Sequence, residues 1–187
     1  EQGDKPIIAV IEDIGASGAY YIAAAADEIV ASPVSLVGSI GVIYAGFGFE
    51  EAIAKIGVER RVMTAGENKA FLDPFQPLDE EAEQFWQGVL SQTHRQFIDD
   101  VRAGRGERLS NSPEIFSGLV WSGEQSLELG LIDQLGSLEQ LSRDQVGDTH
   151  WVDYTPSLDP LDRLTRRFTQ VVAEVLGVNA PSSPLRY

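Results

Sequence analysis

The chain has 187 residues, of which 43% are hydrophobic and 23% charged, a composition that suits one globular domain with a sizeable core. Its formal net charge of -15 at pH 7 would repel a polyanion, so we expect no nucleic-acid partner. The chain contains no cysteine, which excludes a thiolate nucleophile, a thiolate zinc site and a disulfide framework. We expect neither a metal nor a cofactor.

No stretch of the sequence is apolar for long enough to cross a bilayer. The most apolar stretch, residues 19–26, is far shorter than the required length of about 20 residues, and Asp27 and Glu28 end it. The first six residues resemble a linker that leads into a strand rather than a natural start. We therefore expect upstream sequence to precede Glu1.

The first part of the chain alternates short strands and helices. A β-branched apolar run over residues 7–12 predicts a buried parallel strand. Small and aromatic residues over 18–26 predict a helix, and residues 28–32 predict a second strand. Residues 33–42 are expected to form a loop. Alternation of this kind indicates α/β layers.

The middle of the chain contains one long predicted helix. Residues 51–56 predict a short helix that ends at Gly57, and residues 58–64 predict another strand. Residues 79–101 begin with an acidic turn and continue with an apolar face, which predicts a helix.

The last part of the chain predicts short elements and a separate tail. Ser122 caps a short helix that ends at Gly130 and leads to a strand, and another short helix follows from Ser137. Apolar residues over 161–175 recur at three- and four-residue steps, which predicts an amphipathic helix. We divide the chain into a catalytic domain over residues 1–155 and this C-terminal helix and tail over residues 156–187.

Ser17 is the first candidate for chemistry. It lies where a predicted strand turns into a helix, so its hydroxyl can point into open space and the helix N-terminus can stabilise an oxyanion. A serine in this position can also cap the helix. The histidines, His94 and His150, are expected to be structural. Lysine is the other base used with serine, provided that burial keeps it neutral near pH 7.

Residues 13–33 and 37–42 together closely resemble the nucleophile region of the signal peptide peptidase A and SohB family of Ser-Lys serine peptidases (S49). The resemblance implies that Ser17 is the nucleophile and that Lys69, in a Gly-x-x-Lys loop, is the general base. Ser39 would hydrogen-bond the lysine. Ser39 lies 22 residues and Lys69 lies 52 residues after Ser17, which are the offsets that we expect for the family.

The resemblance extends over about residues 7–141 and implies an α/β fold of the ClpP/crotonase type with repeated β-β-α units. The Gly18 amide is the expected oxyanion donor, and Ile40, Gly41 and Val42 are expected to form one wall of the peptide site. Ala19 stands where many relatives have a second glycine. The family's Ser-Pro-Gly-Gly oxyanion turn lies upstream of the nucleophile and is not among these residues, so we expect a fragment that is less active than the full-length protein.

The expected substrates are extended apolar peptides, such as cleaved signal peptides, bound by strand addition. The resemblance also implies a homo-oligomer, in which Ser17 could meet Lys69 of an adjacent protomer; the sequence leaves open whether the dyad is completed within one chain or between two. It implies an upstream anchor in the bacterial cytoplasmic membrane, with the catalytic part on the periplasmic or extracytoplasmic side. Two alternatives stay open: a crotonase-like acyl-transfer enzyme, and a catalytically silent peptide-binding or scaffold homologue.

Overall fold

The computed structural model describes residues 5–146 together with residues 152 and 154. The chain divides into two units, Glu1–Ser137 and Leu138–Tyr187. The C-terminal helix predicted over residues 161–175 lies outside the described residues. Among the described residues, no helix is long and apolar enough to cross a membrane.

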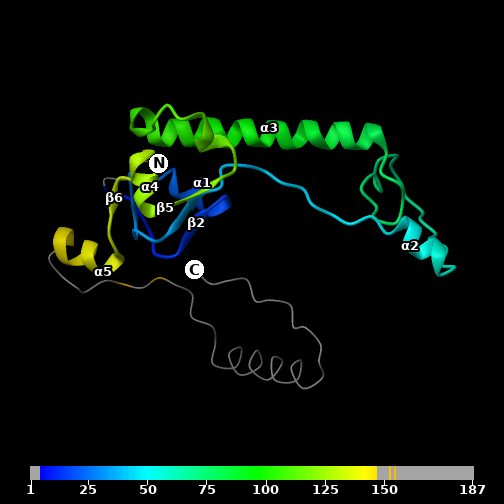
Figure 1. Cartoon of the computed structure of the whole chain (residues 1–187), viewed down its shortest axis with the longest axis horizontal. Coiled ribbons are helices and arrows are strands. Elements are labelled where there is room, and N and C mark those ends of the chain that lie inside the picture. The colour runs from blue at the N-terminus through cyan, green and yellow to red at the C-terminus, as the bar shows by residue number, and fades with distance from the viewer. Residues whose placement is uncertain (1–4, 147–151, 153, 155–187) are drawn as a thin grey trace, which may run out of the picture. The chain divides into compact units, whose positions relative to one another are not determined.

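The first unit begins with a β-β-α repeat (Figure 1). Strand β1 spans Ile8–Ile11 and β2 spans Ile14–Ala16, and helix α1 spans Gly18–Ala23. Strand β1 and helix α1 lie within the segments predicted for them, residues 7–12 and 18–26, whereas β2 was not foreseen.

A second β-β-α repeat follows, with β3 over Glu28–Ala31, β4 over Leu36–Gly38 and α2 over Glu50–Lys55. Strand β1 pairs with β3, and β2 pairs with β4, both in parallel. Corresponding strands of the two repeats therefore lie side by side in two different sheets. This arrangement confirms the layered α/β fold with repeated β-β-α units.

Each sheet gains a third strand from later in the chain. Strand β5 (Val120–Ser122) pairs antiparallel with β4, and β6 (Gln134–Leu135) pairs parallel with β3. Helix α4 (Gly123–Glu128) connects them. Ser122 caps it, as the sequence predicted, and forms a capping box with Gln125 that was not foreseen. The sheet orders are β1-β3-β6 and β2-β4-β5.

Helix α3 (Glu80–Arg105) is the longest helix of the first unit and confirms the long predicted helix. Asp79 caps it by accepting a hydrogen bond from the Ala82 amide at 3.0 Å. Two single 3-10 turns follow it, η1 (Gly106–Arg108) and η2 (Pro113–Phe116). In the second unit, α5 (Leu138–Leu141) confirms the predicted short helix, and a π-helical turn, η3 (Ser142–Val146), follows.

Two expectations for local structure are wrong. Residues 33–42 were expected to be a loop, but β4 forms there because β2 and β5 flank it. Residues 58–64 were expected to be a strand, but they are irregular and exposed, with Met63 at 96% exposure. A strand needs a neighbour to satisfy its backbone groups, and residues 58–64 have none among the described residues.

The core lies between the two sheets and the C-terminal half of α3. Its fully buried apolar side chains include one each from α1, β3, β4, α3 and the segment before β6, namely Tyr20, Ile29, Val37, Val101 and Leu131. The Tyr20 hydroxyl donates a hydrogen bond to the Leu131 carbonyl at 2.8 Å. An ion pair lies at one end of this core, where the buried Arg105 side chain donates two hydrogen bonds to Asp133, each 2.8 Å long.

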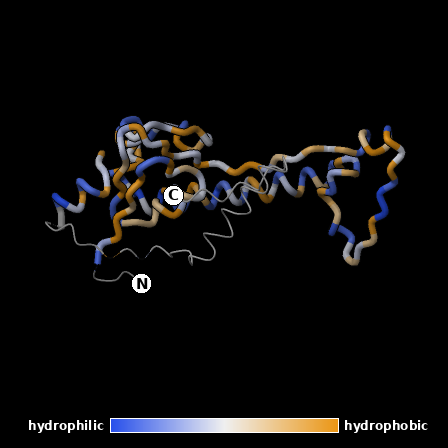
Figure 2. Tube along the Cα trace, turned by 90° about the horizontal axis from the view of Figure 1, so that it is seen from below, coloured by the Kyte–Doolittle hydropathy of each residue, from blue (hydrophilic) through white to orange (hydrophobic). Residues whose placement is uncertain are grey.

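We call residues 41–79 the arm, because they leave the sheets after β4 and follow α3 toward its N-terminus (Figure 1). Their path is fixed by ring contacts between Tyr44 and Trp86 and between Phe71 and Phe85. Figure 2 shows apolar stretches along the arm. Several of its large apolar side chains are exposed, for example Ile43 at 85% and Phe47 at 79%.

Candidate active site

Ser17 joins β2 to α1 and has an unusual backbone conformation. Its φ of 54° and ψ of -122° lie outside the helix and strand regions. Residues other than glycine rarely adopt such a positive φ. Its amide donates to the Gly38 carbonyl at 2.8 Å, and its carbonyl accepts from the Tyr21 amide at 2.9 Å. The Ser17 residue is exposed, and its hydroxyl makes no hydrogen bond to the described residues. The helix-capping alternative is therefore not observed.

Ser39 occupies the matching place after the neighbouring strand. Because Ala16 lies opposite Gly38 in the parallel pair β2–β4, Ser17 and Ser39 follow adjacent strand ends, about 5 Å apart across the sheet. Ser39 also has a positive φ, 51°, and its amide donates to the Leu119 carbonyl at 2.7 Å. The structure thus brings these two predicted serines together.

Gly18 provides the first backbone amide of α1. Within the described residues this amide donates no hydrogen bond, as expected for the first turn of a helix. A side chain built on Gly18 would meet nothing within 4 Å, so the space in front of this turn is open. An amide in such a place can donate to an oxyanion that forms on a carbonyl attacked by Ser17.

The chain that follows Ser39 is held by His94 of α3. The Ile40 side chain is fully buried, and its carbonyl lies 3.0 Å from His94 Nε2. Since a carbonyl only accepts, this ring nitrogen carries the proton. Gly41 is half-buried and Val42 is exposed, so of the three predicted wall residues Ile40 can offer only its backbone to a peptide.

The backbone amides and carbonyls that directly follow Ile40 are not paired with other backbone groups in the described part of the chain. From Gly41 to Gly48, no backbone amide or carbonyl forms a hydrogen bond with another backbone group of the described residues. The pairing resumes at Phe49, whose amide donates to the Pro74 carbonyl at 2.6 Å. Residues 41–48 can therefore pair with an added strand.

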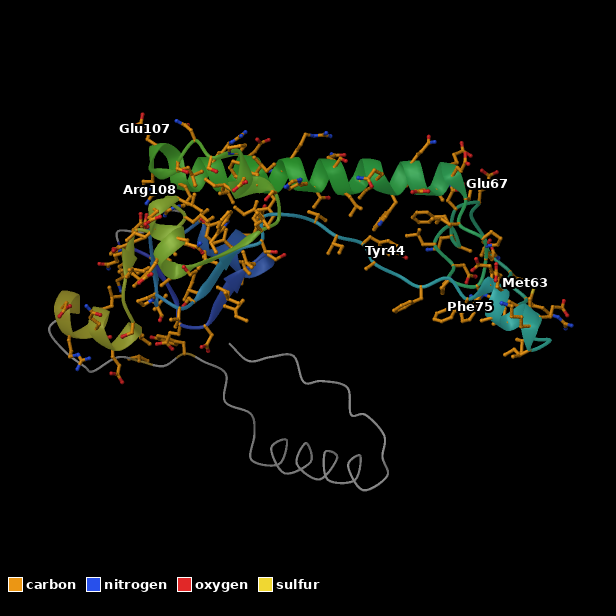
Figure 3. The ribbon with its side chains drawn as sticks, in the orientation of Figure 1. Tyr44, Met63, Glu67, Phe75, Glu107 and Arg108 are labelled. Carbon is orange, nitrogen blue, oxygen red and sulfur yellow. The ribbon has the colours of Figure 1, made fainter. Side chains whose placement is uncertain are left out.

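Lys69 lies in the arm, near the N-terminus of α3. Its amide donates to the Gly66 carbonyl at 3.3 Å, and its side chain is exposed. Phe71, two residues after Lys69, contacts both Phe85 and Trp86 in the second turn of α3. Figure 3 shows Glu67, two residues before Lys69, at this end of α3.

Lys69 and Ser17 therefore lie beside different parts of α3. The Ser17 turn is next to the C-terminal half, where Tyr21 contacts Phe97 with ring centroids 5.1 Å apart. Between Phe85 and Phe97, the helix axis rises by about 18 Å, which is longer than a lysine side chain. A single chain holds Ser17 beside Ser39 but keeps Lys69 away from both.

The Ser17 turn is fastened to α3 by one further contact. The Tyr21 hydroxyl donates a hydrogen bond to Asp100, which raises the pKa of Tyr21. The same hydrogen bond, with another from Gln96, holds the pKa of Asp100 below its usual range. Among the described residues, no group of His, Asp and Glu side chains could hold a metal ion.

The parts of the site that sequence reasoning missed are its supports. His94 was assigned a structural role, but its contact with Ile40 was not foreseen. Leu119, which holds Ser39 by its carbonyl, was not singled out. Both contacts join residues far apart in the chain and depend on backbone atoms, which leave no local signal in the sequence.

Comparison with known proteins identifies the family. The profile of peptidase family S49 matches residues 1–147. The chain belongs to this family. Membership in family S49 agrees with the sequence resemblance.

Two curated relatives show how far the similarity extends. A protein of Brucella abortus (strain 2308) named Na(+)/H(+) antiporter NhaA is 49% identical over 144 residues, which cover 77% of this chain and 20% of that protein. The chloroplastic serine protease SPPA of Arabidopsis thaliana is 34% identical over 137 residues, which cover 73% of this chain and 20% of that protein. The S49 chain thus spans about a fifth of the length of each of these relatives.

One solved structure is that of 1510-N, a membrane-bound stomatin-specific protease, as a mutant in complex with a substrate peptide. It is 14% identical and has a TM-score of 0.35, and the match covers 88% of this chain and 70% of that chain.

Proposed function

We propose that this chain is the catalytic part of a serine endopeptidase that cuts extended apolar peptides, such as cleaved signal peptides, with Ser17 as nucleophile and Lys69 as general base. The observation that carries the proposal is the Ser17 turn. It presents an exposed hydroxyl without a hydrogen bond, on a strained strand-to-helix junction and beside Ser39. Membership in family S49 supports the peptidase class.

The proposed reaction has two steps. In the first, the Lys69 amine takes the Ser17 proton while Ser17 Oγ attacks the scissile carbonyl, and the Gly18 amide stabilises the oxyanion. The protonated amine then gives this proton to the leaving amine, which leaves an acyl ester on Ser17. In the second step Lys69 takes a proton from water while the water oxygen attacks the ester carbonyl. The protonated amine then gives this proton to Ser17 Oγ as the ester bond breaks, which releases the acid and restores Ser17. Ser39 hydrogen-bonds the Lys69 amine and orients it.

The base for each Ser17 comes from a neighbouring copy in this proposal. Support comes from the exposure of Lys69 and from the separation of about 18 Å along α3 between the two neighbourhoods. A lysine acts as a base near neutral pH only where burial disfavours its charged form. Docking of one arm against the Ser17 turn of another copy would bury the amine. The functional unit is therefore a homo-oligomer.

The peptide binds by strand addition to residues 41–48. Support comes from their unpaired backbone groups and from the exposed side chains of Val42 and Ile43 beside them. Main-chain hydrogen bonds would give affinity for any extended peptide, while the apolar side chains favour apolar substrates.

We place the protein at the bacterial cytoplasmic membrane, with the catalytic part on the extracytoplasmic side and an anchor outside this chain. This part of the proposal is supported by the resemblance to signal peptide peptidase A. The same membrane supplies the substrates, because cleaved signal peptides are released there.

The experiment uses the full-length protein, a fluorogenic apolar peptide and a serine-reactive fluorophosphonate. Ser17→Ala should abolish labelling and hydrolysis, and Lys69→Ala should lower hydrolysis by at least about a hundred-fold. Lys55→Ala is the matched control, because Lys55 is another exposed arm lysine, paired only with Glu51, and this variant should keep full activity.

The two alternatives predict different results. A silent scaffold would bind the peptide without hydrolysis or labelling of Ser17. A crotonase-like enzyme would bind an acyl-CoA and would not need Lys69. Normal cleavage by Lys69→Ala would show that the base is misassigned.

A further inference from the structure

His94 is a side chain of α3 that takes no part in the proposed proton transfers. It is half-buried, and its Nε2 donates a hydrogen bond to the Ile40 carbonyl at 3.0 Å. Ile40 directly follows Ser39 and directly precedes residues 41–48, whose backbone groups are unpaired among the described residues. The His94 hydrogen bond therefore attaches the start of the proposed peptide-binding segment to α3.

A second contact attaches the same segment four residues later. The rings of Tyr44 and Trp86 meet nearly at right angles, with centroids 5.6 Å apart. Figure 3 labels Tyr44 on this part of the chain, beside α3. Between the two contacts, the segment and α3 enclose a cavity of about 230 Å³. Among the residues that line this cavity are Val42, Ile43, Leu90 and Ser91. The segment thus spans a gap between two points of attachment.

The spacing of the two contacts determines the conformation between them. Trp86 and His94 are eight residues apart in α3, so they are separated by about 12 Å along the helix axis. Ile40 and Tyr44 are four residues apart, and an extended chain covers about 13 Å over four residues. The chain between them must therefore be nearly extended. Figure 1 shows its course beside α3.

We propose that His94 is a positioning residue, which holds the first residues of segment 41–48 extended before a peptide arrives. A strand normally obtains this conformation from a paired neighbour, which these residues do not have within the described part of the chain. Here α3 takes the place of that neighbour, through His94 at one end and Trp86 at the other. The inference rests on the proposed function, because it assumes that the peptide adds to residues 41–48.

Preorganisation of this kind raises affinity for an extended peptide. If the segment were free, binding would also have to order its backbone, and ordering one residue reduces affinity by a factor of about ten. A segment that is already extended avoids this cost. His94 acts through the Ile40 carbonyl, so its loss should weaken peptide binding without impairing the attack by Ser17.

The test compares His94→Gln with His94→Asn in the full-length protein. The glutamine amide extends about as far as Nε2 and can keep the hydrogen bond, whereas the asparagine amide is one methylene shorter and loses it. For the fluorogenic apolar peptide, KM should rise about ten-fold in His94→Asn and stay at the wild-type value in His94→Gln. Both variants should keep kcat within about two-fold of wild type and should react with the fluorophosphonate at the wild-type rate, because labelling needs no strand addition.

Thr93→Val is the matched control. Thr93 also donates a hydrogen bond to a carbonyl, that of Val89 at 2.9 Å, but this bond lies within α3. The variant should keep the wild-type KM. Urea unfolding of all three variants measures the structural role separately. If His94→Asn is too unstable to measure, His94→Leu replaces it, since leucine fills similar space without a donor.

Three results would overturn the role of His94. One is a lower free energy of unfolding in His94→Asn with an unchanged KM, which would make the contact purely structural. Another is an equal rise of KM in His94→Asn and His94→Gln, which would show that the hydrogen bond is not responsible. The third is a fall in fluorophosphonate labelling as large as the loss in kcat/KM, which would place the effect on Ser17 itself.

A failure of the proposed function gives a different pattern. If the wild-type protein cuts no peptide, that proposal fails, and fluorescence anisotropy with the uncleaved peptide still tests His94. Binding about ten-fold weaker in His94→Asn than in wild type and His94→Gln would support the positioning role. Equal affinity in the three proteins, or no binding by any of them, would overturn it.

Discussion

Two serines at positive φ end two neighbouring parallel strands. Such conformations cost about 1–3 kcal/mol each and persist only where the surroundings enforce them. Here the Ser17 amide is held by Gly38 and the Ser39 amide by Leu119. Glycine adopts these angles without strain. A serine at either position provides a hydroxyl but lowers the stability of the fold, which is expected where the hydroxyl has a function.

The role of Ser39 can be separated from its structural effect. Ser39→Gly removes the hydroxyl and relieves the strain at φ 51°, while Ser39→Ala removes the hydroxyl and keeps the strain. We expect both variants to lose about ten-fold or more in kcat. Urea unfolding should show Ser39→Gly to be more stable than Ser39→Ala by about 1 kcal/mol. Wild-type kcat in Ser39→Gly would assign Ser39 a backbone role only.

At the scale of elements, α1 and α3 approach so closely that one position needs glycine. A Cβ on Gly104 of α3 would lie 1.9 Å from the carbonyl oxygen of Ala24, at the end of α1. The same helix contains Gly88, where a Cβ would meet nothing within 4 Å. The close approach fixes α1, and with it the Ser17 turn, on the helix that carries His94.

This packing predicts opposite effects for the same substitution in one helix. Gly88→Ala should stabilise the protein by about 0.5–1 kcal/mol, because alanine favours the helix. Gly104→Ala should destabilise it by about 2 kcal/mol or more, because α1 must move. Thermal or urea unfolding of both variants is the measurement. Stabilisation by Gly104→Ala would contradict the observed contact.

The buried ion pair between Arg105 and Asp133 joins α3 to the segment before β6. The Arg105 side chain is fully buried, and Asp133 also accepts a hydrogen bond from the Ile29 amide of β3 at 2.7 Å. Partial burial raises the pKa of Asp133, but the hydrogen bonds from Arg105 and Ile29 and the charges of Arg105 and Arg108 outweigh it. The pKa of Asp133 is therefore below its usual value.

Asp133→Asn should lower stability by about 3 kcal/mol at pH 7, because Arg105 stays buried without a countercharge. A lowered carboxyl pKa stabilises the fold above the unfolded-state pKa, and this contribution disappears as pH falls through the folded-state pKa. The difference between wild type and variant should therefore narrow below about pH 4. Urea unfolding between pH 3 and 7 measures it. A constant difference would contradict the role of the Asp133 charge.

At the scale of the whole molecule, the sequence predicted those helices and strands whose apolar pattern or N-cap lies within the element itself. The apolar run of β1, the N-cap at Ser122 and the apolar face of α3 were all identified from the sequence. Strands β2, β4 and β5 have only three residues each, too few for a periodic pattern, and exist because they pair with one another. The irregular segment 58–64 shows the converse, since strand-like residues form no strand without a neighbour.

In the candidate site, too, some features could be predicted from the sequence and others could not. Sequence resemblance identified Ser17 and Ser39, and the parallel register of β2 and β4 brings them together. The position of Lys69 in the arm could not be predicted, because the course of residues 41–79 depends on ring contacts with α3. In the proposed oligomer, each site therefore combines Ser17 of one copy with Lys69 of another.

The most direct test mixes two inactive proteins. Ser17→Ala and Lys69→Ala variants of the full-length protein are unfolded or dissociated, combined in equal amounts and reassembled. Random assembly should restore activity in about a quarter of the sites, since those sites pair an intact Ser17 with an intact Lys69 from another copy. Hydrolysis of the fluorogenic apolar peptide at that level would support the account. A mixture that stays as inactive as its components, while reassembled wild type cuts the peptide, would contradict it.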